Sequence, residues 1–116
     1  MQEQLNLVIE KHCETIKHNV ETLGSMLTAI AGGTDPRTMV AEAEALAHQL
    51  KGSCGTAGFH DISRAATTLD DHLKILCRSS EDGVTSGLAE AMKLFQSLDD
   101  AASVATPSTS TLYKPV

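Results

Sequence analysis

The sequence predicts an all-α protein, an antiparallel up-down four-helix bundle. Three observations carry this prediction. Apolar residues recur every three to four positions in four successive segments, no segment alternates apolar and polar residues as a strand does, and the loops between segments are short. Short loops force neighbouring helices to run antiparallel, so that their apolar faces can close on a common core. With 116 residues, the chain has the length of one such domain.

The first apolar stripe predicts a long amphipathic helix over residues 5–30. Two glycines end it, and Thr34, Asp35 and Pro36 then start the next helix. Asp35 is expected to cap free backbone amides, and Pro36 suits the first helical turn. The second stripe covers residues 39–54 and predicts the second helix.

The second helix is expected to end near Gly55 to Gly58, where glycine becomes frequent. The third and fourth stripes cover residues 62–77 and 84–102, separated by a polar turn. After residue 103 the chain turns to Ser, Thr, Ala and Pro, with too little apolar surface to order itself. We therefore expect a bundle over residues 1–104 and a disordered or extended tail or linker over residues 105–116.

Composition excludes several classes of function. The chain is 41% apolar, 21% charged and 3% aromatic, with a net charge of −6, so it lacks the basic surface and aromatic platforms that nucleic-acid binding needs. Its longest uncharged run is too short to cross a bilayer, and its acidic start is unlike a signal peptide, which predicts a cytoplasmic protein. Cys13, Cys54 and Cys77 form no CxxC pair, which indicates three reduced thiols. We expect a monomer.

One histidine lies on the wrong face of the second helix for a core residue. On a helical wheel the apolar stripe centres roughly 150° from His48, so the imidazole points outward. Its neighbours on that face are Ala41, Ala45 and Gly52, where a surface helix normally carries long polar side chains. Helical side chains lean toward the N-terminus, so glycine at position 52 leaves the imidazole uncovered. Lys51 adds a positive charge one turn away.

The string AHQLKGSCGTAGF over residues 47–59, followed by Leu69 and Leu73, resembles the histidine-containing phosphotransfer (HPt) family. The signature of that family is His-x-x-Lys-Gly-small followed by further glycine. The specific part of the resemblance covers residues 47–73, and the bundle as a whole covers residues 5–102. The resemblance implies a four-helix phosphorelay protein that carries a phosphoryl group on His48.

In this resemblance, Nε2 of His48 attacks the phosphoryl group of a receiver-domain aspartate or a kinase, Lys51 stabilises the phosphoryl oxygens, and Gly52 gives the partner access. The implied partners are response-regulator receiver domains and a sensor histidine kinase, which dock over a surface that includes Ala41, Glu44, Ala45 and Gly55. The resemblance implies no cofactor, metal or nucleotide-dependent kinase activity in this chain, since the Mg²⁺ belongs to the receiver domain.

Asp70 stands where many members of that family have Gln or Glu, which can orient the second imidazole nitrogen. Asp is one methylene shorter. The alternative is that Asp70 and Asp71 form a solvated acidic face of the third helix.

Other interpretations stay open with less support. Gly52, Gly55 and Gly58 can be read as a phosphate loop, but a helix precedes them where such loops follow a strand. A metal site would need ligands among the five histidines, which lack the spacing of a bundle metal site. These five are His12, His18, His48, His60 and His72.

A plain helical adaptor or dimerisation bundle would use the same small residues around His48 for close packing. The N-terminal phosphotransfer domain of a chemotaxis-type kinase is a further alternative. The length and the start at Met1 favour a free-standing protein.

Overall fold

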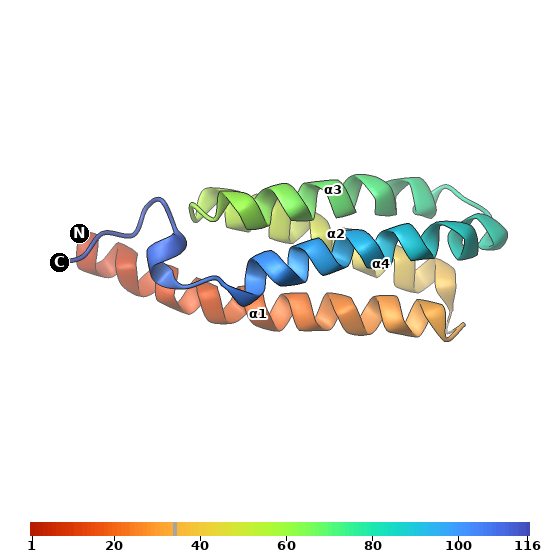
Figure 1. Ribbon diagram of the computed structural model, residues 1–116, viewed down its shortest axis with the longest axis horizontal. Coiled ribbons are helices and arrows are strands. Elements are labelled where there is room, and N and C mark those ends of the chain that lie inside the picture. The colour runs from red at the N-terminus through yellow and green to blue at the C-terminus, as the bar shows by residue number, and fades with distance from the viewer. Residues whose placement is uncertain (34) are drawn as a thin grey trace.

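The computed structural model describes residues 1–33 and 35–116. In these residues four α-helices lie side by side in a rod of 53 × 19 × 19 Å (Figure 1). The helices are α1 (Gln2–Ala31), α2 (Pro36–Thr56), α3 (His60–Cys77) and α4 (Glu81–Ser103), and a short 3-10 helix, η1 (Pro107–Thr109), follows. The predicted all-α class and four-helix bundle are confirmed.

The junction between α1 and α2 agrees only in part with the prediction. Pro36 occupies the first position of α2 as expected, but no described backbone amide donates a hydrogen bond to the Asp35 side chain. Asp35 has a φ of 29°, so its backbone adopts an uncommon conformation that does not give the usual capping geometry. Thr34 lies outside the described residues. The other end of α2 agrees, since the helix stops at Thr56, within two residues of Gly58.

The apolar stripes meet in one continuous core along the axis of the rod. The most extensive helix contact is that of α2 with α3, which places the predicted functional helix against the third helix. Cys13 and Cys54 are buried free thiols, and Cys77 is an exposed one. The largest fully buried side chains come from all four helices and include Ile16, Leu23, Leu27, Leu50, Leu69, Leu73 and Leu98.

The C-terminal segment corrects the prediction of a flexible tail over residues 105–116. The segment folds back over the end of the bundle and runs beside the start of α1, so that the two termini lie together (Figure 1). Ala105 and Ser110 are buried in this contact. The buried Asn6 of α1 donates a hydrogen bond from Nδ2 to the carbonyl of Lys114 at 2.6 Å.

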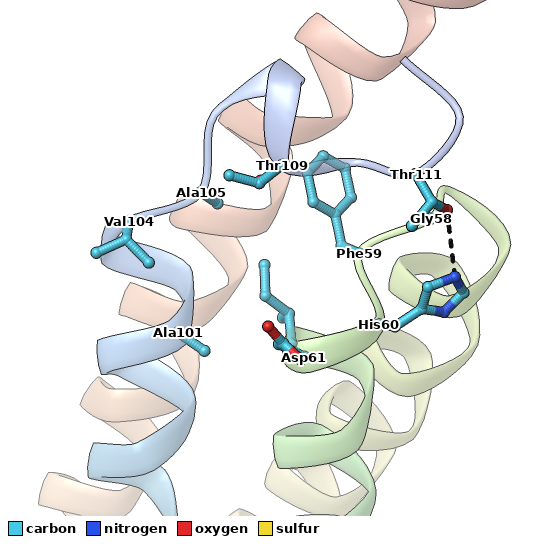
Figure 2. Close-up of a pocket in the computed structure, with 10 residues that line it drawn as sticks. Gly58, Phe59, His60, Asp61, Ala101, Val104, Ala105, Thr109 and Thr111 are labelled. Atoms are coloured by element: carbon cyan, nitrogen blue, oxygen red, sulfur yellow. Dashed lines mark hydrogen bonds between the residues drawn. The ribbon is translucent and has the colours of Figure 1, made fainter. Parts of the chain in front are cut away.

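Few apolar residues of this segment are buried, and hydrogen bonds to distant backbone groups add to their packing, which explains why composition did not predict its order. Ser110 Oγ donates to the carbonyl of Ala57 at 2.6 Å, and the Thr111 amide donates to the carbonyl of Gly58 at 3.0 Å. Gly58 has a φ of 85°, and a Cβ there would lie 2.7 Å from Ser110 Oγ. Figure 2 shows Thr111 reaching His60 beside Gly58. Because glycine has no Cβ, position 58 adopts this conformation and leaves room for the C-terminal segment.

Candidate functional site

His48 projects from the middle of α2 toward solvent, as the helical wheel predicts. Its side chain is 61% exposed, whereas Ala47 and Leu50 on the opposite face are fully buried. Ala45 and Ala41, one and two turns before it, are exposed as well. The imidazole is therefore accessible to another folded surface, and Ala41 and Ala45 add only methyl groups on the exposed side of the preceding turns.

Gly52 leaves open space on the other side of the imidazole. Among the described residues outside its own helix turn, no atom lies within 4 Å of the position that a Cβ at Gly52 would take. A glycine inside a helix costs about 1 kcal/mol relative to alanine. Packing within the domain does not require glycine here and therefore does not explain why α2 carries this destabilising residue.

Asp70 of α3 lies directly beneath the imidazole. Its carboxylate Oδ2 is 3.1 Å from His48 Nδ1, and the Asp70 side chain is fully buried. An ionised carboxylate only accepts hydrogen bonds, so Nδ1 carries the hydrogen and donates it. The lone pair of the neutral imidazole then lies on Nε2. The alternative of a solvated acidic face is wrong for Asp70, whereas Asp71 is exposed.

Two further charged residues surround Asp70, and neither of them was predicted to contact it. Lys74, one turn later on α3, donates from Nζ to Asp70 Oδ2 at 3.0 Å. Glu44 stands one turn before His48 on α2, and one polar atom from each of Glu44, His48 and Asp70 lies within 4.8 Å of the other two. The available signal was the spacing of four residues in Glu44–His48 and in Asp70–Lys74, which places each pair on one helix face.

The carboxyl groups of Glu44 and Asp70 compete for one proton. A hydrogen bond to Asp70, burial and the Asp70 charge raise the pKa of Glu44. Burial raises the pKa of Asp70, but hydrogen bonds from Glu44, Lys74 and His48 outweigh it and leave that pKa below its ordinary value. Asp70 is therefore the carboxyl that stays ionised, and Glu44 is the one that takes up the proton first.

Glu44, His48 and Asp70 are also a possible set of cation ligands, which the histidine spacing alone did not indicate. Lys74 already places a positive charge on Asp70 Oδ2, and this charge opposes a cation at the same carboxylate. The remaining histidines are apart from this cluster. His12 is stacked on Phe59 with ring centroids 6.1 Å apart, and His72 contacts the carbonyl of Gly87 at 2.9 Å. A multi-histidine site does not form in the described chain.

The other residues singled out in the sequence divide into two groups. Lys51 is half-buried, one turn after His48, and its carbonyl accepts a hydrogen bond from Ser63 Oγ at 2.8 Å. Gly55 was expected on the docking surface, but a Cβ at this position would lie 3.2 Å from Ser63 Oγ of α3. Gly55 therefore serves the contact of α2 with α3. Since Gly58 seats the C-terminal segment, the three glycines do not form a phosphate loop.

An apolar groove of about 500 Å³ adjoins the open side of Gly52. It runs between the first turns of α1 and the last turns of α2, and Leu112 of the C-terminal segment closes one side. Val8 of α1, which lines it, is 64% exposed. The apolar periodicity predicts core positions for these α1 residues, so it does not predict the groove.

None of the described helices has the length and apolar character that crossing a membrane requires. Comparison with curated proteins and with solved structures gives no match. The family model of the Hpt domain, by contrast, matches residues 8–104, which include all of α2 and α3 and the site around His48. A match over that share of the sequence shows that the chain belongs to the Hpt domain family.

Proposed function

We propose that this chain is a phosphorelay intermediate that accepts a phosphoryl group on Nε2 of His48 and passes it to a response-regulator aspartate. The donor is a receiver-domain aspartyl phosphate or a sensor histidine kinase. The observation that supports this most is the exposed imidazole whose Nδ1 is held by the fully buried Asp70. That arrangement turns the nucleophilic nitrogen toward solvent, where a partner's active site can reach it.

Phosphoryl transfer depends mainly on alignment and on stabilising charge, so a carrier of this kind needs no nucleotide pocket. His48 supplies an attacking nitrogen in a fixed orientation. We assign to Lys51, one turn away on the same helix, the stabilisation of the phosphoryl oxygens by a charge-assisted hydrogen bond. The Mg²⁺ that this chemistry uses belongs to the receiver domain in this proposal.

The proposed partner surface consists of Ala41, Ala45 and Gly52 together with the apolar groove beside Gly52. Small residues around His48 allow a close approach, and the groove offers apolar area next to the reacting nitrogen. Glu44 lies at the edge of this surface and is half-buried. The occupant is a receiver domain, whose aspartate must come within bonding distance of Nε2. We place the protein in the cytoplasm, where free cysteines such as these stay reduced.

The direct test is transfer of radiolabelled phosphate from phosphorylated receiver domains of the source organism. We expect label on the wild type that is acid-labile and base-stable, as a phosphoramidate is, and no label on His48→Gln. His60→Gln is a matched control, because that exposed histidine is the first residue of α3 and lies outside the cluster around His48. Equal labelling of His48→Gln and wild type would refute the assignment of the site. Absence of label from every donor would leave the helical adaptor as the better reading.

A further inference from the structure

Lys74 brings a positive charge to the base of the site through an ion pair with the buried Asp70. Its Nζ lies 3.0 Å from Asp70 Oδ2, and the same oxygen lies 3.1 Å from His48 Nδ1. The Lys74 side chain is 38% exposed, whereas Asp70 is fully buried between the ammonium and the imidazole. Asp70 therefore links Lys74 to His48.

Asp70 needs such a partner to stay ionised. Burial favours the neutral form of a carboxyl group, so the fully buried Asp70 stays a carboxylate only where hydrogen-bond donors or a cation offset that burial. A neutral His48 donates a hydrogen bond to Asp70 but contributes no positive charge. Lys74 is the cation within hydrogen-bond distance of the Asp70 carboxylate, and Asp71 and Glu44 in turn act on Lys74. Burial and the charges of Glu44 and Asp70 raise the pKa of the Cys77 thiol.

The charge of Asp70 decides which imidazole nitrogen is the nucleophile. As a carboxylate, Asp70 accepts the hydrogen on Nδ1, so the lone pair is on the exposed Nε2. As a carboxylic acid, Asp70 donates its O–H to Nδ1, and the ring hydrogen then resides on Nε2. In that second tautomer Nε2 has no free lone pair and cannot attack phosphorus.

We propose that Lys74 is a positioning residue of the phosphotransfer site, which holds Asp70 as a carboxylate and thereby keeps the lone pair of His48 on Nε2. The proposal rests on the proposed function. In the transfer step, the Nε2–P bond forms while the P–O bond of the donor's aspartyl phosphate breaks, and the donor carboxylate leaves with the electron pair. Nδ1 keeps its hydrogen throughout, so the ring becomes positive, and the Asp70 carboxylate stabilises that charge.

The first experiment reads the tautomer of the unphosphorylated protein by ¹⁵N NMR of the His48 ring. At about pH 7 we expect wild type and Lys74→Arg to show a protonated Nδ1 and an unprotonated Nε2. In Lys74→Met, both nitrogens should shift toward an average of the two tautomers. Lys93→Met removes an exposed lysine of α4 and serves as the charge-matched control. Identical ring shifts in Lys74→Met and wild type would overturn the proposal, whether or not the protein carries phosphate.

The second experiment measures the rate of phosphoryl transfer from a receiver domain against pH. Lys74→Met should lose about tenfold or more at about pH 6.5 and much less at about pH 8.5, because the higher pH removes the proton from Asp70 again. Lys74→Arg should restore the wild-type profile. In the Asp70→Asn background, where the amide oxygen accepts from Nδ1 without charge, Lys74→Met should cause no further loss. An equal loss in both backgrounds would show that Lys74 acts independently of Asp70 and would refute the proposal.

Discussion

Replacing Gly52 by glutamine should make the protein more stable and a poorer phosphotransfer protein at the same time. Residue 52 lies inside α2, and a Cβ there meets no described atom within 4 Å outside its own helix turn. The new side chain therefore creates no clash within the domain. Because helical side chains lean toward the N-terminus, it lies over the imidazole of His48, one turn earlier.

The two effects can be estimated separately. Glutamine is a better helix former than glycine by about 0.5–1 kcal/mol, which raises the melting temperature of a domain of this size by roughly 2–6 °C. A cover over Nε2 displaces the incoming aspartyl phosphate, and a misplacement of about 1 Å can cost about a hundredfold in rate. We expect transfer to slow by about tenfold to a hundredfold.

The assay pairs thermal unfolding, followed by circular dichroism, with single-turnover transfer from a phosphorylated receiver domain. Gly52→Ala is the matched control, since it should gain the same helix stability while its methyl group leaves most of the imidazole open. Its transfer rate should stay within about threefold of wild type. A glutamine variant that transfers at the wild-type rate would refute the steric explanation of Gly52. A glutamine variant of lower stability would refute its placement as an open helical position.

Three other predictions follow from the same structure. The raised pKa of Glu44 means that its carboxyl group stabilises the fold below its ordinary pKa and that this stabilisation is lost as the pH rises through the pKa of the folded state. Glu44→Gln should therefore raise the free energy of unfolding, measured with urea, more at about pH 7 than at about pH 4. A thiol reagent should modify Cys77 in the native protein and Cys54 only on unfolding, because burial raises the pKa of Cys54 to about 11. Truncation after Val104 should lower the free energy of unfolding by about 1–3 kcal/mol, since it removes the hydrogen bonds that hold the C-terminal segment.

The fold and the position of His48 were predictable because both depend on periodicity. Four apolar stripes separated by short loops define the bundle, and the same spacing places His48 on the outer face of α2. The C-terminal segment was not predictable from composition. Its order depends on hydrogen bonds to Ala57, Gly58 and Asn6, which are distant in sequence and leave no local periodic signal. The apolar groove was not predictable for a related reason, because Leu112 of the C-terminal segment forms one of its sides.

The reach of Asp70 to His48 was the least predictable part of the site, and small side chains explain it. The buried sides of α2 and α3 carry small residues, Ala43 and Ala47 on α2 and Ala66 on α3, and Gly55 of α2 faces Ser63 of α3. Small residues at a helix contact let the two backbones approach closely. A shorter carboxyl side chain is then long enough to reach Nδ1. A wheel drawn for one helix gives the direction of Asp70 but not the distance to the next helix. The size of the residues between the helices determines that distance, so Asp70, Ala43 and Ala47 form one structural unit, and enlarging either alanine should lengthen the 3.1 Å contact.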